Sequence, residues 1–342
     1  MHTFSKLKVL VIGAGSIGQR HAFNLNKLGV KNVAIYDTDP LKAKQLAGKY
    51  GTHHYYDLDS AASFKPDCSF VCTYPSTHLE LANFCLDVNS HVFIEKPIAT
   101  TTSGIQSMLR KAERKKLKIS VGYNMRFDKG LNYLKKKVQS KYCPLAISSQ
   151  WGHNLKLWRP GLNYKNHYLL QKENSLILDD SHEYDYLRWL LEDEASSVYC
   201  QTQKIPSLKK SEGIASMTIK FRKGTVANLF IDMLRPKYER MCHVLSDHGD
   251  IRWQFIPSKI AWKNYDSKAH SIVTENLLNS KLLVQQKFEV VTNQMYVDEI
   301  RNFLSAIVSD TNSFVDGWEG LKTLKIGLAA IESASKNKVV SL

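Results

Sequence analysis

Long apolar runs are absent from this 342-residue sequence. A helix that crosses a membrane needs about 20 consecutive apolar residues, and the longest runs here are far shorter. The first of them, residues 9–12, follows the amino terminus too closely to leave room for a signal peptide. We therefore expect a cytoplasmic protein with no membrane segment.

The sequence also lacks any C-x-x-C pair, any internal repeat and any low-complexity segment. Its six cysteines are scattered, and three of them, Cys68, Cys72 and Cys85, fall in apolar stretches. This distribution is typical of buried, reduced thiols and gives no support to a disulfide framework or a metal site. The length is enough for two domains, each with its own core.

Acidic residues are in the minority, with 32 Asp and Glu against 47 Lys and Arg, for a net charge of +15. The excess is greatest over residues 101–141, which include the basic triplets 114–116 and 135–137. Such a patch can bind nucleic acid. The triplets fall late in predicted helices, however, where cations favour the helix dipole. We therefore expect solvated helix faces and no nucleic-acid partner, with attraction of an anionic substrate as the second interpretation.

A glycine motif follows the apolar run at residues 9–12, which is typical of a strand buried on both faces of a parallel sheet. Residues 13–18 read G-x-G-x-x-G, and residues 19–28 predict a helix. The first glycine permits a tight turn, the second lets the backbone approach a diphosphate, and the third lets the helix pack closely on the strand. The helix amino terminus would bind the diphosphate. The predicted cofactor contacts are Gly13, Gly15, Ser16, Ile17 and Gly18.

An acidic residue, Asp37, follows the next predicted strand (residues 32–36), about 20 residues after the motif, where it would accept hydrogen bonds from a ribose hydroxyl. No arginine stands beside it to hold a 2′-phosphate, so NAD is favoured over NADP. The alternative is that Asp37 caps the following helix. Asp39 is the better cap, because Pro40 then occupies the first helical position.

Strands predicted at residues 68–73, 91–95 and 118–123 alternate with helices at 76–87 and 101–116. This alternation predicts a doubly wound parallel sheet, which binds its ligands at the carboxyl edge. Lys96 follows the strand at 91–95 directly, and lysine suits acid–base work because its pKa shifts readily. Lys96 is therefore expected near a bound nicotinamide; the alternative is an ordinary solvated strand end.

A different pattern begins at residue 124. Residues 142–151, 213–221, 225–232 and 243–255 predict strands, with turns at Gly224 and Gly249, and residues 292–309 and 318–336 predict closing helices. This is typical of an α+β layer with an antiparallel sheet. We expect an α/β Rossmann domain at 1–123 and a substrate and oligomerisation domain at 124–342, whose last helix is a candidate to pack back on the first.

Asp179, His182 and Asp185 would share one face of a continuous helix. A histidine flanked by carboxylates suits a general base. The alternative is a surface helix capped by Asp179 or Asp180, with His182 a bystander.

Aromatic residues and an arginine precede this helix, at Trp158, Arg159 and Tyr164. They suit a sugar ring or an anionic group, or equally a set of core aromatics.

Taken together, the sequence resembles the Gfo/Idh/MocA family of nicotinamide-dependent oxidoreductases nearly end to end. The motifs that carry the resemblance are residues 13–21, 73–78, 91–97, 122–127, 179–185 and 317–322. It implies a catalytic lysine at Lys96, and a base or acid at His182 with Asp179 beside it. It also implies a sheet that mediates homodimers or homotetramers. Further contacts implied are Thr73, Pro75, His78 and Glu95 for the cofactor, and Asn124 and Arg126 for the substrate.

The resemblance also makes the Lys96–Pro97 bond a candidate for the cis form. Two departures from the family pattern stand before His182. Residues 173–175 are not glycines, and Asp179 lies one residue closer to His182 than is common, so Asp180 is a rival aspartate. Residues 158–182 resemble a subgroup associated with surface sugars, which implies a sugar, sugar acid or nucleotide sugar.

The sequence thus predicts an NAD-dependent dehydrogenase that acts on a secondary alcohol of a sugar-like substrate. Two alternatives stay open: an imine or biliverdin-type reductase, which needs no base at His182, and a non-catalytic dinucleotide sensor.

Overall fold

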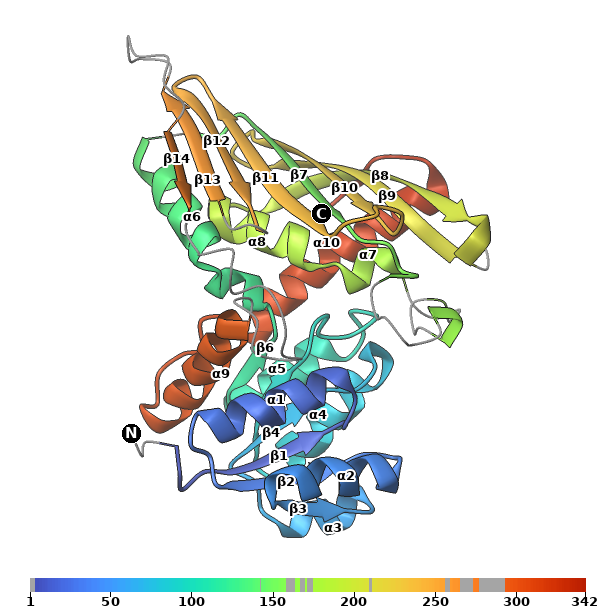
Figure 1. Cartoon of the computed structure of the whole chain (residues 1–342), viewed down its shortest axis with the longest axis vertical. Coiled ribbons are helices and arrows are strands. Elements are labelled where there is room, and N and C mark those ends of the chain that lie inside the picture. The colour runs from blue at the N-terminus through green and yellow to red at the C-terminus, as the bar shows by residue number, and fades with distance from the viewer. Residues whose placement is uncertain are drawn as a thin grey trace. The chain divides into compact units, whose positions relative to one another are not determined.

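The chain forms two compact units, each built around its own sheet (Figure 1). The first contains Met1–Asn124 and Gln285–Leu324, and the second contains Met125–Val284 and Lys325–Leu342. The computed structural model describes residues 4–141, 143–157, 164–166, 170, 175–208, 211–255, 259–264, 273–276 and 293–342.

The first unit holds a six-stranded parallel sheet in the order β3-β2-β1-β4-β5-β6. This parallel order confirms the doubly wound sheet predicted from the alternation of strands and helices. Its central strands are almost wholly apolar and buried. The strands are β1 (Lys8–Ile12), β2 (Asn32–Tyr36), β3 (His53–Tyr55), β4 (Cys68–Val71), β5 (His91–Ile94) and β6 (Ile119–Val121). The short edge strand β3 was not predicted, because its polar sequence has no apolar run.

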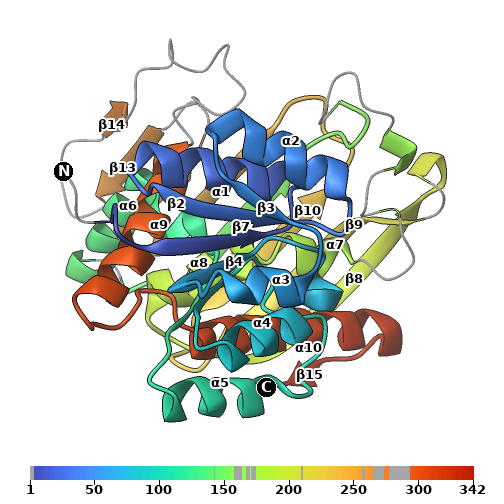
Figure 2. The same ribbon diagram turned by 90° about the horizontal axis from the view of Figure 1, so that it is seen from below.

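Helices cover both faces of this sheet. Figure 2 shows α1 and α2 on one face and α4 and α5 on the other. One helix from late in the chain, α9, also belongs to this unit and packs against α1. The helices are α1 (Ser16–Lys27), α2 (Pro40–Tyr50), α3 (Leu58–Ser63), η1 (Pro75–Thr77), α4 (His78–Asp87), α5 (Ile105–Arg114) and α9 (Asn293–Val308). The last helix, α10 (Gly317–Lys336), begins in the first unit and ends in the second.

The second unit holds a nine-stranded sheet in the order β14-β13-β12-β11-β7-β10-β9-β8-β15. Only β7 and β10 pair in parallel, so the largely antiparallel sheet is confirmed. The strands are β7 (Ala146–Gly152), β8 (Ala195–Ile205), β9 (Ser211–Phe221), β10 (Val226–Asp232), β11 (Glu239–Ser246), β12 (Gly249–Gln254), β13 (Lys259–Asn264), β14 (Val273–Asn276) and β15 (Val340–Ser341). The predicted strand at residues 243–255 is two strands, divided at the turn before Gly249.

Short helices lie along one face of this sheet, as Figure 1 shows for α6, α7 and α8. Their apolar residues and the inward side chains of β7 to β12 form the core of the unit. The elements are η2 (Asn124–Phe127), α6 (Lys129–Lys141), η3 (Tyr164–Asn166), α7 (Leu176–Asp179), α8 (His182–Leu191) and η5 (Pro206–Leu208).

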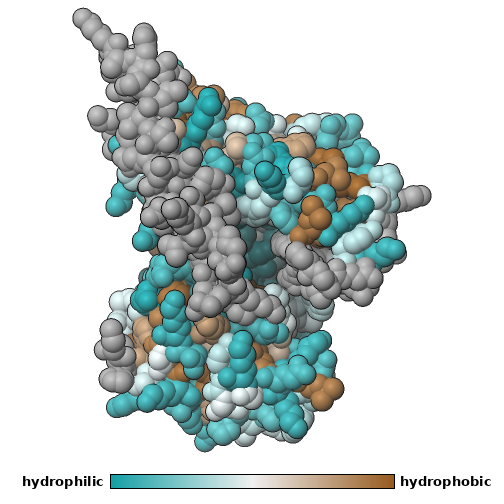
Figure 3. All heavy atoms as spheres, in the orientation of Figure 1, coloured by the Kyte–Doolittle hydropathy of each residue, from teal (hydrophilic) through white to brown (hydrophobic). Residues whose placement is uncertain are grey.

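Among the described residues, no helix combines the length and the apolar composition that crossing a membrane requires. On the face drawn in Figure 3, hydrophilic residues alternate with small hydrophobic patches. All six cysteines are free thiols, and only Cys143 is exposed.

Candidate active site

The glycine motif forms the turn between β1 and α1, and its three glycines meet different surroundings. Gly13 has φ +102°, and a Cβ there would lie 2.7 Å from the carbonyl oxygen of Cys72. A Cβ on Gly18 would lie 1.8 Å from the carbonyl oxygen of Gly13. A Cβ on Gly15 would meet no atom within 4 Å. Two glycines therefore allow the close packing of loop and helix, whereas Gly15 leaves an open approach to the backbone.

Helix α1 begins at Ser16 beside this open position. Gly15 is its N-cap, the described residues supply no side-chain cap, and no acidic residue occupies the first turn. The first backbone N–H groups of a helix have no partner within it and carry the positive end of its dipole, so they bind anions. Ser16 is exposed and Ile17 is half-buried. This turn fits the diphosphate of a dinucleotide.

Asp37 stands at the end of β2 and is hydrogen-bonded to the glycine loop. Its Oδ2 accepts the Ala14 N–H at 2.6 Å, and its Oδ1 accepts the Asp39 N–H at 2.8 Å. Asp39 caps α2 by accepting the N–H groups of Leu41 and Lys42, as the sequence predicted. A carboxylate offers about four acceptor sites, so Asp37 can hold the loop and still accept a ribose hydroxyl.

The loop after β4 is joined to the loop after β5 through His78. The imidazole is fully buried, with Nδ1 2.8 Å from the Pro97 carbonyl oxygen and Nε2 3.1 Å from that of Thr73. Burial lowers the pKa of His78, although both carbonyl contacts oppose the shift. Thr73 itself is half-buried and bonded through its hydroxyl to Thr77 at 2.7 Å, and half-buried Pro75 opens η1. The buried His78 thus joins the loop after β4 to the loop after β5 in the interior of the unit.

Lys96 follows β5 at the same carboxyl edge of the sheet as the glycine loop and Asp37. Its side chain is half-buried, and the Lys96–Pro97 peptide bond is cis, as predicted. The Lys96 N–H donates to Glu95 Oε2 at 3.2 Å, and Glu95 Oε1 lies 2.6 Å from Nε2 of His21. Glu95 is only 7% exposed, so its carboxylate supports the Lys96 backbone from inside the unit.

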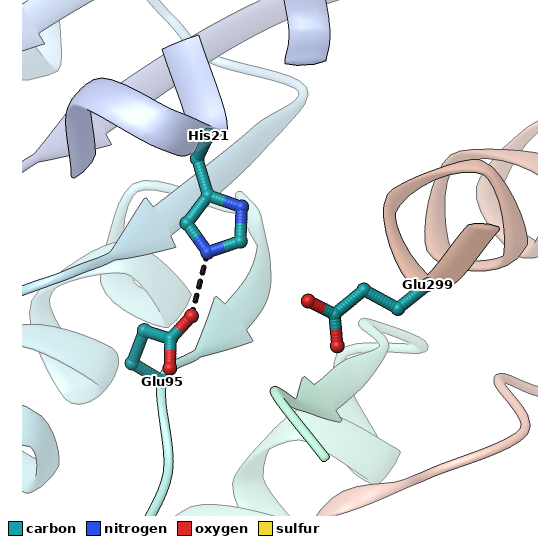
Figure 4. Close-up of side chains that lie close together, drawn as sticks. All are labelled: His21, Glu95 and Glu299. Atoms are coloured by element: carbon teal, nitrogen blue, oxygen red, sulfur yellow. Dashed lines mark hydrogen bonds and ion pairs between the residues drawn. The ribbon is translucent and has the colours of Figure 1, made fainter. Parts of the chain in front are cut away.

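A third buried group, Glu299 of α9, approaches this pair (Figure 4). One ligand atom from each of His21, Glu95 and Glu299 lies within 4.8 Å of the others, the only such potential metal-binding group among the described residues. Glu299 is not among the site residues that the sequence predicted. The available signal was an acid at a buried position of α9, between Val297 and Ile300.

In the second unit, the predicted continuous helix is wrong. Helix α7 ends at Asp179, α8 begins at His182, and Asp180 between them has φ −98° and ψ 35°. The physical reason is an ion pair, because buried Asp180 lies 3.1 Å from Arg240 of β11, which also pairs with Glu183 at 2.8 Å. Asp180 is thus engaged in the interior, whereas Asp179 and His182 are both half-buried.

Two predicted substrate residues are buried. Arg126 forms a two-pronged ion pair with Asp185, with Nε–Oδ2 2.9 Å and Nη2–Oδ1 2.8 Å, and the two side chains are 3% and 0% exposed. Asn124 is 2% exposed, and within the described parts of the chain its Oδ1 has no hydrogen-bond partner. Arg126 therefore belongs to the buried interior of its unit, where it pairs with Asp185.

The remaining predicted substrate contacts lie before α7. Tyr164 begins η3 and is half-buried, with the Lys156 ammonium 5.6 Å from its ring centroid. Trp158 and Arg159 lie outside the described residues.

Comparison with known proteins gives matches over most of the chain. Residues 7–123 match the model of an oxidoreductase family with an NAD-binding Rossmann fold, and residues 172–342 match that family's C-terminal alpha/beta domain. The inositol 2-dehydrogenase/D-chiro-inositol 3-dehydrogenase of Lacticaseibacillus casei is 27% identical over 346 residues, spanning 97% of this chain and 92% of its own.

Two solved structures share the fold. An oxidoreductase from Agrobacterium radiobacter, in complex with NAD+, L-tartaric acid and magnesium, matches with a TM-score of 0.85 and 19% identity over 98% of each chain. The UDP-N-acetylglucosamine 3-dehydrogenase of Acidithiobacillus ferrooxidans matches with a TM-score of 0.80 and 18% identity. It covers 96% of this chain and 98% of its own.

Proposed function

Because this chain belongs to the Gfo/Idh/MocA family of NAD-binding oxidoreductases, we propose that it oxidises a secondary alcohol of a sugar, sugar acid or nucleotide sugar. The observation that carries the proposal is the position of Lys96. It follows β5, and the glycine loop follows β1, two strands away on the same edge of one parallel sheet. Lys96 and the glycine loop thus lie at the one edge where sheets of this type bind their ligands, which supports the proposed roles of both.

The substrate class is supported by the relatives. The curated protein from Lacticaseibacillus casei is named for inositols, which are cyclic polyols, and a solved structure with the same fold is named for a nucleotide sugar. In each, the reacting group is a secondary alcohol on a ring. A dehydrogenase is favoured by these comparisons over an imine reductase or a sensor without activity.

Each residue has one task in the proposed reaction. NAD, when bound, supplies the acceptor for the hydride that leaves the carbinol carbon. The Lys96 ammonium donates a hydrogen bond to the substrate oxygen and stabilises the negative charge that develops there. His182 accepts the hydroxyl proton as a general base. Of the two candidate aspartates, Asp179 is proposed to assist His182, since Asp180 is already paired with Arg240.

The experiment is a turnover assay of the purified protein with NAD and a panel of myo-inositol, D-chiro-inositol and UDP-N-acetylglucosamine. Formation of NADH is followed by absorbance. Lys96→Met should lower turnover by about 100-fold or more, the contribution typical of a donor that stabilises negative charge developing on the reacting oxygen. Lys111→Met is the matched control, because Lys111 pairs with exposed Asp87 on the surface and should retain full activity.

Near-wild-type turnover in Lys96→Met would refute the role of this lysine. Unchanged turnover in His182→Ala would refute the general base at His182, and the imine reductase, which needs no base there, would be favoured if the protein also reduced imines but oxidised no alcohol of the panel. Tight NAD binding without turnover on the whole panel would favour the sensor.

Homodimers or homotetramers, formed through the open face of the nine-stranded sheet, and a cytoplasmic location complete the proposal. Phe230 of β10 and Leu245 of β11 support the interface, because each is 38% exposed on a strand whose neighbouring positions are buried. The free thiols support a reducing compartment. Light scattering tests the interface: Phe230→Glu should lower the oligomer mass, and an unchanged mass would contradict this use of the sheet.

A further inference from the structure

Glu299 is a buried acid to which the reaction proposed above assigns no role. It lies in the middle of α9 and is 3% exposed, and neither carboxyl oxygen has a hydrogen-bond partner within the described residues. A buried polar group without a partner costs free energy. The presence of Glu299 in the interior therefore requires a physical explanation.

The direction of this side chain is fixed by the packing of α9. At the start of the helix, Asn293 and Asn24 exchange side-chain hydrogen bonds of 2.8 and 3.3 Å. One turn after Glu299, Phe303 packs on Phe93 with ring centroids 5.7 Å apart. Contacts on both sides of Glu299 thus hold the helix in one register against the sheet.

In that register, the Glu299 carboxyl points toward the His21–Glu95 pair, as Figure 4 shows. Glu95 is already held at both oxygens, by His21 at 2.6 Å and by the Lys96 N–H at 3.2 Å. A Cβ on Gly122 would lie 3.1 Å from Glu95 Oε2, so the backbone closes off another side of the carboxylate. Glu299 approaches from a third element, α9.

The pKa values of the two carboxyl groups shift in opposite directions. Burial raises the pKa of Glu299, and the nearby negative charge of Glu95 raises it further. The positive charge of Arg20 lowers this pKa, but by less than the other two effects raise it. Burial also acts to raise the pKa of Glu95, but the hydrogen bond and charge of His21, with the charges of Lys96 and His78, outweigh burial and lower it. The charged or titratable groups that face the pair are Arg20 and His21 of α1, the buried Cys72 thiol, His78 of α4, and Lys96.

We propose that Glu299 is a positioning residue that acts as a neutral carboxylic acid, bracing the Glu95 carboxylate and thereby holding Lys96 in place. A neutral acid has an O–H to donate, and Glu95 is an acceptor of the same cluster, with an oxygen within 4.8 Å of a Glu299 oxygen. The proposed hydrogen bond requires these two oxygens to approach to about 2.5–3.0 Å. The inference rests on the proposed function, because the role of Lys96 in turnover gives its position a consequence. If Glu299 has this role, α9 supports the carboxyl edge of the parallel sheet, where Lys96 lies.

The first test asks whether Glu299 acts as a neutral hydrogen-bond donor. Glu299→Gln keeps the shape and a donor, so it should retain turnover within about threefold of wild type, while Glu299→Leu removes the donor. A displaced lysine can cost up to about 100-fold in rate. Glu299→Leu should therefore lower kcat about 10-fold or more, with the Kd of NAD nearly unchanged. A wild-type kcat in Glu299→Leu would overturn the proposal, and so would a Glu299→Gln variant as impaired as Glu299→Leu.

The second test needs no turnover, and therefore stays informative if the proposed function fails or if Glu299→Leu does not fold. A pKa raised by folding means that protonated Glu299 stabilises the folded state at acid pH. This contribution is lost as the pH rises from the ordinary range of glutamate toward the raised pKa. Glutamine does not titrate, so wild type should weaken relative to Glu299→Gln as the pH rises. The ratio of their unfolding constants should change about tenfold per pH unit within that window. A pH-independent ratio would refute the neutral acid.

A metal ion held by His21, Glu95 and Glu299 is the competing explanation. It requires deprotonated ligands, whereas the 2.6 Å contact of His21 with Glu95 is the length of a hydrogen bond. Elemental analysis before and after dialysis against EDTA decides between them. Metal-free protein with unchanged kcat supports the proposal, and a stoichiometric metal that Glu299→Gln loses would overturn it.

Discussion

Alanine substitutions at two glycines of the same loop should differ in their effects: Gly18→Ala should destabilise the fold, whereas Gly15→Ala should leave stability nearly unchanged and weaken cofactor binding. Gly18→Ala would place its Cβ 1.8 Å from the Gly13 carbonyl oxygen, so loop or helix must move. Overpacking of this kind costs about 1–3 kcal/mol, and sometimes more. Gly15→Ala would meet no atom within 4 Å, and Gly15 has φ −66° and ψ −172°, which alanine also adopts.

The stability of Gly15→Ala can be worked from two small terms. Reduced freedom of the unfolded chain stabilises the variant by about 0.4–1 kcal/mol, and a less favourable N-cap offsets this by several tenths of a kcal/mol. The net change should therefore be near zero. The methyl group would nevertheless occupy the open approach to the backbone beside α1. We expect the NAD affinity of Gly15→Ala to fall at least tenfold, or about 1.4 kcal/mol.

The assay pairs urea unfolding with calorimetric titration of NAD on the same preparations. Gly48→Ala is the matched control, because Gly48 is an exposed position inside α2 where a Cβ also meets nothing within 4 Å. It should gain roughly 0.8 kcal/mol from helix propensity and bind NAD as wild type does. If Gly15→Ala binds NAD with wild-type affinity, the open side of the loop is not the diphosphate site. If Gly18→Ala is as stable as wild type, the close packing described here is wrong.

Two further substitutions test the other predicted contacts. Arg126→Met should lower the free energy of unfolding by about 3–5 kcal/mol, because it removes the guanidinium that pairs with the buried Asp185 carboxylate. Adding Asp185→Leu should recover much of that loss, and urea unfolding that shows no recovery would contradict the structural role. Asp37→Ser should reduce the preference for NAD over NADP at least tenfold in kcat/KM, since it removes the charge that repels a 2′-phosphate. An unchanged ratio in steady-state kinetics would show that Asp37 serves only to hold the Ala14 N–H.

The first unit could be predicted well because its signals are local. An apolar run of four residues predicts a buried strand, and the glycine motif predicts the turn that follows this strand. The N-cap at Asp39 could be predicted for the same reason, because cap and proline are neighbours in sequence. These features depend on contacts within a few residues, which a sequence displays directly. The strands and the turn that carry the predicted cofactor contacts could be predicted on those grounds.

The features that the sequence did not disclose are buried charges whose partners lie far along the chain. The break between α7 and α8 depends on Arg240, 60 residues beyond Asp180. The acid facing Glu95 comes from α9, in a part of the chain expected to belong to the second domain. A local pattern shows Asp180 only as a cap and Glu299 only as a polar residue in an amphipathic helix. Periodicity locates a buried face but does not report which distant charge enters it.

The difference between buried charges with distant partners and half-buried charges also decides which mutations can identify a residue that acts on the substrate. A buried charge is retained when a partner stabilises it, and removing one partner is costly whether or not the pair takes part in catalysis. Arg126 and Asp180 each have such a partner in the interior, so loss of activity on mutating them would not by itself assign them to the substrate. Lys96 and His182 are half-buried. For these two residues, loss of turnover with unchanged unfolding free energy would be evidence of chemistry, and the stability measurement must therefore accompany every activity measurement.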